Sequence, residues 1–190
     1  MKAFLEIIIG PMFSGKTSKL LDIYKQCKFC NIEVCVINHY TDKRYSQDKL
    51  SSHDGIMIPC FQVEKISDII EVNLNTDEII QNNNYNNSEV VLINEGQFFP
   101  DLYECVLKML SSNKKVYVCG LDGDFERNKF GQILDLIPHC DKVQKLHSLC
   151  GKCKTGEPGI FSKRLSDEKE QTVVGNDNYI PVCRMCYEKQ

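Results

Sequence analysis

The stretch EIIIGPMFSGKTSKLLDIYKQC, residues 6–27, determines how the rest of the chain is arranged. Its apolar beginning is typical of a buried β-strand, and its second half has the composition of an α-helix. Between them stands GPMFSGKT, residues 10–17, which matches the pattern G-x-x-x-x-G-K-[ST] in the strand-to-helix context that this pattern requires. The sequence therefore predicts a phosphate-binding loop at the start of a helix.

Each part of this loop has a chemical role. Gly10 and Gly15 let the backbone curl so that amide hydrogens face phosphate oxygens, and the helix N-terminus adds the positive end of its dipole. Lys16 reaches the outer phosphates, while Thr17 offers its hydroxyl to Mg²⁺. Because the protein mainly positions groups and stabilises charge in phosphoryl transfer, the loop predicts ATP or GTP without identifying the acceptor.

Further apolar runs alternate with helix-like segments along the chain. We expect strands at residues 4–9, 33–38, 89–94, 115–120 and 142–146, and helices at residues 16–30 and 101–111. Such alternation indicates βαβ units, and nearly continuous apolar strands indicate a sheet covered on both faces. The predicted fold is an α/β nucleotide-binding domain over residues 1–148, a P-loop parallel sheet flanked by helices. A small zinc-binding domain follows over residues 149–190, where CxxC pairs and charges replace long apolar runs.

The apolar run VVLI, residues 90–93, ends on Asn94 and Glu95. Ligands of open α/β sheets gather at the carboxyl ends of strands, so Glu95 is a candidate general base for an attacking hydroxyl. The alternative is an ordinary acid on a solvated turn. Asn94 is neutral and lacks the attraction of a carboxylate, about 4 kcal/mol at 4 Å and an effective dielectric of 20. We expect a weakened magnesium site.

Two cysteine pairs mark the C-terminal part, CGKC and CRMC. Four thiolates at this spacing are typical of structural zinc, with Cys150, Cys153, Cys183 and Cys186 as ligands. The intervening segment, with a small strand expected at residues 172–175, suits a loop that closes over a substrate. A plain surface loop is the alternative. Cys27 and Cys30, in CKFC, are interpreted as two helix-end thiols without a metal.

Composition narrows the classes of function. The chain has 190 residues, a net charge of −3 and a pI near 5.8, which favours a small-molecule substrate and gives no general reason to bind nucleic acid. The start of the chain lacks a basic segment, and no apolar run approaches the roughly 20 residues that span a bilayer. Eleven cysteines are an odd number, which favours reduced or metal-bound thiols. We expect a cytoplasmic enzyme without a membrane role.

The motifs GPMFSGKT, DKRY, NEGQFFPD, LDGDFERNKFG, CGKC, SKRL and VCRMCY occur in this order along the chain. In order and approximate spacing the sequence closely resembles the type II (cytosolic) thymidine kinases over nearly its whole length. The resemblance implies transfer of the ATP γ-phosphate to the 5′-hydroxyl of thymidine, giving thymidine monophosphate for DNA precursor salvage. It also implies a zinc-stabilised lasso domain, a homotetramer and feedback inhibition by thymidine triphosphate.

The resemblance also implies residue roles, with Glu95 as the catalytic base. The implied ATP-binding residues are Gly10, Pro11, Met12, Phe13, Ser14, Gly15, Lys16, Thr17, Asp42, Arg44, Asn94 and Gln97. The implied thymidine-binding residues are Met12, Phe98, Leu121, Phe125, Phe130, Thr172, Val173, Val174, Gly175 and Tyr179.

Three positions depart from the family pattern. Asn94 stands where the family has Asp, and Asp124 and His147 stand where Thr is expected. The latter two motivate a second candidate function, a deoxynucleoside kinase of broader specificity. A third is a zinc-ribbon ATPase acting on nucleic acid, which the acidic balance disfavours. A fourth is a catalytically silent binding protein, and retention of Lys16, Thr17 and Glu95 weighs against it.

Overall fold

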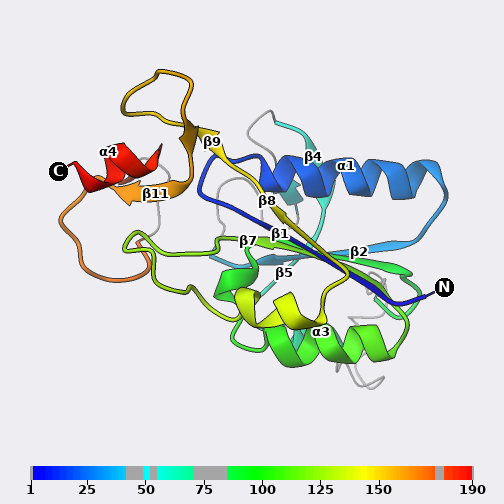
Figure 1. Cartoon of the computed structure of the whole chain (residues 1–190). Coiled ribbons are helices and arrows are strands. Elements are labelled where there is room, and N and C mark those ends of the chain that lie inside the picture. Colours follow the sequence, from blue (N-terminus) through cyan, green and yellow to red (C-terminus); the bar gives the residue numbers. More distant parts are fainter. Residues whose placement is uncertain (1, 42–48, 52–54, 71–84, 174–177, 190) are drawn as a thin grey trace.

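A six-stranded parallel sheet forms the centre of the molecule in the computed structural model, which describes residues 2–41, 49–51, 55–70, 85–173 and 178–189 (Figure 1). The strands follow the order β5-β2-β6-β7-β1-β8. Their bounds are β1 Phe4–Ile9, β2 Val34–His39, β5 Phe61–Val63, β6 Val90–Ile93, β7 Lys115–Gly120 and β8 Lys142–Lys145. The parallel sheet is confirmed, and the five predicted strands lie within one residue of their expected bounds. The edge strand β5 is too short to be recognised from an apolar run.

The two predicted helices lie on opposite faces of the sheet (Figure 1). They are α1, Lys16–Phe29, and α3, Leu102–Ser111. The side chains of β1 alternate between the two faces: Ile7 and Ile9 join the core that α3 covers, and Ile8 joins the core that α1 covers. Because both faces are buried, the strand is apolar at almost every position. Shorter helices are α2, Ser67–Ile70, η1, Gly96–Phe98, and η2, Ile133–His139.

The C-terminal elements lie at the end of the sheet toward which β1 runs (Figure 1). Two antiparallel pairs form there, β9 Ser148–Leu149 with β10 Pro158–Gly159, and β11 Phe161–Arg164 with β12 Tyr179–Val182. Helix α4, Arg184–Glu188, follows. Elsewhere, β3, Lys49–Ser51, pairs antiparallel with β4, Met57–Pro59. The division into domains at residue 148 stays a prediction. None of the helices in the described ranges is long and apolar enough to cross a membrane.

The prediction of a small strand at residues 172–175 is wrong for Thr172 and Val173, the two of these residues that the structure describes. Thr172 and Val173 lie outside any strand, and residues 174 and 175 fall outside the described ranges. The strands of this segment are β11 and β12 instead, and the Val173 carbonyl accepts a hydrogen bond from the Tyr179 hydroxyl, at 3.2 Å. A side chain therefore holds this backbone where the sequence pattern suggested a strand ladder.

Candidate active site

The phosphate loop connects β1 to α1, and its two glycines are needed for different reasons. Gly10 has φ 151°, and a Cβ at this position would lie 2.5 Å from the Leu146 carbonyl oxygen. Gly15, which caps α1, has open space around it but adopts φ 83°, in the left-handed region that glycine reaches without strain. Phe13 also lies in this region, with φ 60°. The loop thus has the tight curl that the sequence pattern predicts.

Lys16 and Thr17 stand at the first turn of α1, as expected. The Lys16 ammonium donates to the Pro11 carbonyl at 2.7 Å and is largely buried in the loop. The Thr17 hydroxyl donates to Oδ1 of Asn94, 3.4 Å away. Strand β7 separates β1 from β6 in the sheet, so this hydrogen bond brings the phosphate loop to the end of a strand that is not its neighbour.

Asn94 is buried in a network that fixes the orientation of its amide. Its nitrogen donates to Oδ1 of the equally buried Asn38 at 2.8 Å, and the Cys119 thiol donates to its oxygen at 3.0 Å. The Asn94 oxygen therefore faces Thr17. Amide carbonyls and hydroxyls are oxygen ligands that suit a hard cation, so the pair fits a divalent ion, but without a full negative charge. The sequence assigned no role to Cys119, because a thiol within an apolar strand resembles a core residue.

Glu95 adopts φ 54° just before η1, a left-handed conformation that is uncommon outside glycine. Nε2 of Gln97 donates to its Oε2 at 2.7 Å, and the Leu121 amide donates to Oε1 of Gln97 at 2.9 Å. Both polar groups of the Gln97 side chain are thus engaged within the protein. Its predicted contact with ATP stays a prediction, and its contact with Glu95 was not foreseen.

Aromatic side chains gather beside Glu95. The Phe98 ring meets Phe130 edge-on with centroids 5.4 Å apart, and the His39 ring lies 5.4 Å from Phe98. Burial lowers the pKa of His39, although the carboxylates of Glu64 and Glu95 oppose this shift. Two of the residues predicted to enclose a flat base, Phe98 and Phe130, are therefore brought together.

Phe125, a third predicted base-site residue, belongs to a different stack. The Arg164 guanidinium lies 3.7 Å from the centre of the Phe125 ring and donates to the Tyr179 hydroxyl at 2.7 Å. It also donates to three backbone carbonyls of the following segment, those of Glu168, Glu170 and Gln171. Because Tyr179 in turn holds the Val173 carbonyl, Arg164 organises the chain that leads into the predicted lid. The sequence motif SKRL includes Arg164 but does not indicate this role.

Hydrogen bonds connect the C-terminal segment to the loops that follow β1 and β7. The Met12 amide donates to the Ser162 hydroxyl at 2.9 Å, the Tyr187 hydroxyl donates to the Phe125 carbonyl at 2.6 Å, and Gln171 donates to Oδ2 of Asp124 at 2.8 Å. The predicted ligand Met12 is thus held from the C-terminal side.

Asp124 and His147, the two departures that suggest a broader substrate range, make contacts within the protein. Oδ1 of Asp124 accepts the amides of Glu126 and Asn128, each at 2.9 Å, and its Oδ2 accepts Gln171. His147 is exposed, with Nδ1 3.2 Å from the Ser148 carbonyl oxygen. Asp124 thus shapes its own loop and contacts Gln171, and the broader substrate range stays an untested alternative.

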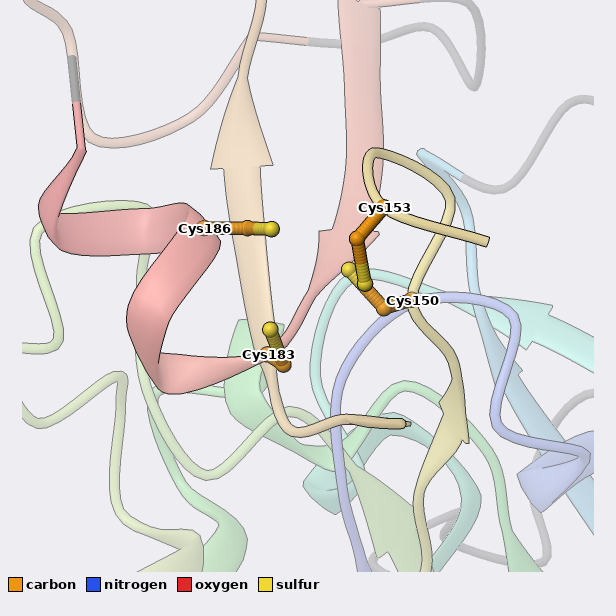
Figure 2. A group of neighbouring side chains, drawn as sticks. All are labelled: Cys150, Cys153, Cys183 and Cys186. Atoms are coloured by element: carbon orange, nitrogen blue, oxygen red, sulfur yellow. The ribbon is translucent and has the colours of Figure 1, made fainter. Parts of the chain in front are cut away.

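The four predicted zinc ligands form one cluster, with all their sulfur atoms within 4.8 Å of one another. Figure 2 shows the sulfurs of Cys150 and Cys153, from the turn after β9, pointing toward those of Cys183 and Cys186 at the start of α4. Tetrahedral zinc with bonds of about 2.3 Å needs sulfurs about 3.8 Å apart, so the cluster is close to the required geometry.

The thiol pKa values in this cluster diverge. Desolvation opposes ionisation of Cys150, but amides of Cys153 and Cys183 stabilise its thiolate and the pKa falls to about 6. Desolvation and the neighbouring sulfurs raise the pKa of Cys186 to about 12. Four thiolates therefore need a cation among them, and the donor set fits zinc. Of the remaining predicted site residues, Asp42, Arg44, Val174 and Gly175 lie outside the described ranges.

The fold and the site are those of a P-loop α/β protein that has a carboxylate at the end of a core strand and a cluster of four cysteines near its C-terminus. The model of the thymidine kinase family matches residues 3–187, and the chain belongs to this family. It is 38% identical over 187 residues to a thymidine kinase of Yaba monkey tumor virus, covering 98% of this chain and 95% of the relative. Identity to a thymidine kinase of Monkeypox virus is 37%, covering 96% of each chain. Identity to thymidine kinase a of Arabidopsis thaliana is also 37%, covering 96% of this chain and 74% of the relative.

Proposed function

We propose that this protein transfers the γ-phosphate of ATP to the 5′-hydroxyl of thymidine, giving thymidine monophosphate and ADP. The hydrogen bond between Thr17 and Asn94 carries the proposal, because it brings the phosphate loop to within one residue of Glu95. A phosphate held on the loop and a hydroxyl held at Glu95 would then share one site. Family membership supports the choice of thymidine as acceptor.

In this reaction Glu95 accepts the proton of the 5′-hydroxyl as that oxygen forms a bond to the γ-phosphorus. The bond from the γ-phosphorus to the β–γ bridging oxygen breaks, and the electron pair leaves with ADP. Lys16 and the loop amides bind the phosphates and stabilise their charge. The Thr17 hydroxyl and the Asn94 oxygen would hold Mg²⁺, which when bound would neutralise phosphate charge.

The thymine base is proposed to bind against Phe98 and Phe130, whose edge-on pair offers a flat base an apolar wall. Tyr179 and the backbone after Gln171 would close the opposite side. We also propose a structural zinc ion on the four cysteines, a cytoplasmic location, a homotetramer and feedback inhibition by thymidine triphosphate, with the C-terminal module beginning at residue 149. These finer points rest on the resemblance of the sequence motifs to the type II thymidine kinases.

A phosphorylation assay with ATP and Mg²⁺ and each of the four deoxynucleosides tests the proposal. We expect thymidine to be the preferred acceptor, and the proposal fails if thymidine is not phosphorylated. Glu95→Gln keeps the shape of the side chain but removes the base, so turnover should fall by about 10²- to 10⁴-fold while ATP and thymidine still bind. Glu104→Gln, on the exposed part of α3, is the matched control and should leave turnover unchanged.

A further inference from the structure

We propose that Gln97 is a positioning residue for the reaction: it holds the Glu95 carboxylate in the orientation in which Glu95 accepts a proton. This inference rests on the proposed function and adds to it a second residue that acts through the base. It arises from a hydrogen-bonded chain that runs from β7 through Gln97 to Glu95.

The direction of this chain is fixed by one backbone group. The Leu121 N–H can only donate, and it donates to Oε1 of Gln97 at 2.9 Å. The other end of the amide, the NH₂ group, must therefore point the opposite way, and it meets Oε2 of Glu95 at 2.7 Å. Gln97 is only 3% exposed, so water has little access to its side-chain amide, whereas Glu95 is half-buried. The carboxylate of Glu95 thus has a donor from the protein on one oxygen, which restricts the orientation of the group.

Two glycines leave the space in which Gln97 is held. A Cβ on Gly120 would lie 2.3 Å from Oε1 of Gln97, and a Cβ on Gly131 would lie 2.1 Å from the Gln97 carbonyl oxygen. Gly131 also has φ 60°, which favours glycine. Gly120 precedes the motif LDGDFERNKFG and Gly131 ends it. Both glycines leave the space that the buried side chain and backbone of Gln97 occupy next to Glu95.

The backbone of Glu95 explains why such support is needed. At φ 54° it lies in a region that costs a non-glycine residue roughly 1–2 kcal/mol, and conformations of this kind persist where neighbouring structure holds them. Gln97, two residues further on within η1, links this turn to the end of β7. Positioning by Gln97 should therefore affect turnover more than substrate affinity.

Two variants of Gln97 separate its two hydrogen bonds. Gln97→Met has a similar volume and loses both, whereas Gln97→Glu keeps the acceptor for the Leu121 amide and replaces the donor to Glu95 with a carboxylate that repels it. We expect both to lower kcat by about 10- to 100-fold, the scale on which small misplacements of a reacting group act. The KM for thymidine and for ATP should change by less than about 3-fold if the effect passes through the base. Gln132→Met, which removes another glutamine that accepts a backbone amide, that of Tyr103, is the control and should leave kcat unchanged.

Combining each change with Glu95→Gln gives the decisive readout. If Gln97 acts through Glu95, Gln97→Met should have almost no further effect on kcat in the Glu95→Gln background. A purely structural residue would lower kcat by the same factor in both backgrounds and raise KM or lower the melting temperature with it, which would overturn the inference. Where the Glu95→Gln rate is too low to measure, the split between kcat and KM decides. An inactive wild type would refute the proposed function, whereas an active wild type with near-normal Gln97 variants would refute only the role of Gln97.

Discussion

The sheet and the C-terminal module are stabilised by different means. In the sheet, Leu5, Ile7 and Ile8 of β1 are fully buried among other aliphatic side chains on two faces, and burial of each such side chain is worth about 1.5–3 kcal/mol. In the C-terminal module the buried apolar cluster consists of Val182 with Cys150 and Cys183. The sheet can therefore fold on its hydrophobic core, whereas the module relies on polar contacts and on the zinc ion proposed above.

The proposed site combines both regions. The phosphate loop and Glu95 lie at strand ends of the sheet. From the C-terminal module, Ser162 accepts a hydrogen bond from Met12 of the phosphate loop, and Gln171 donates one to Asp124 in the loop after β7. Substitutions that unfold the module should therefore prevent closure of the site but leave the sheet folded. Substitutions at the strand ends should instead change the rate of the reaction or the affinity for the metal.

The largest effect should come from removing a sulfur ligand. We expect Cys153→Ser to lose its zinc and to lower thymidine phosphorylation by at least about 100-fold, because zinc binding supplies about 10–16 kcal/mol to small modules that fold around it. Atomic absorption measures the loss of zinc. Protease cleavage mapped by mass spectrometry should show that the cleavage sites are confined to the C-terminal module. Cys30→Ser, at an exposed thiol, is the control. A Cys153→Ser protein that still binds one zinc tightly and resists protease would contradict this difference between the two regions.

The next effect concerns the polar centre of the module. Arg164→Met removes a buried guanidinium from three carbonyls and from the Phe125 ring. Hydrogen bonds to charged groups contribute about 1.5–3 kcal/mol each, so we expect the KM for thymidine to rise by about 10- to 100-fold while zinc content stays normal. Steady-state kinetics with each substrate varied measures this.

The neighbouring Lys163→Met is the control for Arg164, because the Lys163 ammonium lies over the Tyr187 ring at a distance of 6.0 Å from its centre. An equal rise in the KM for ATP would indicate that the whole site had been disturbed. An unchanged KM for thymidine would mean that Arg164 does not organise the lid.

The sequence predicted those parts of the molecule whose signals are local. The phosphate loop, the strands, the two long helices and the four cysteines each depend on a short pattern. The contacts that organise the site join distant residues, such as Asn38 with Asn94 and Gln97 with Leu121. A sequence pattern identifies the polar side chains but not their partners, so Gln97 was assigned to ATP through resemblance alone. Asp124 was likewise assigned to substrate range, although its carboxylate is engaged by its own loop and by Gln171.

A smaller effect is expected at the neutral strand end of the sheet. Asn94→Asp places a carboxylate beside Thr17, so the Mg²⁺ concentration for half-maximal rate should fall, but only several-fold, because the buried charge must also be desolvated. Without Mg²⁺ the variant should melt at a lower temperature, since Asn38 must turn its amide to donate. Asn38→Asp places the same charge one hydrogen bond further from Thr17 and should destabilise without this gain. An unchanged magnesium requirement in Asn94→Asp would show that Asn94 does not weaken the metal site.

The smallest effect tests whether the sheet has its own sensitivity to acid. Burial holds the pKa of His39 below its usual value, so the folded protein binds fewer protons here than the unfolded chain. This contribution to stability is complete above pH 6.5 and is lost as the pH falls through the folded pKa, with a slope of at most about 1.4 kcal/mol per pH unit for one proton. Urea unfolding between pH 5 and pH 7.5 should show a flatter dependence in His39→Gln than in the wild type. Loss of zinc in acid would affect both proteins equally, so it cancels in their difference. Parallel curves would show that His39 does not contribute to the acid sensitivity.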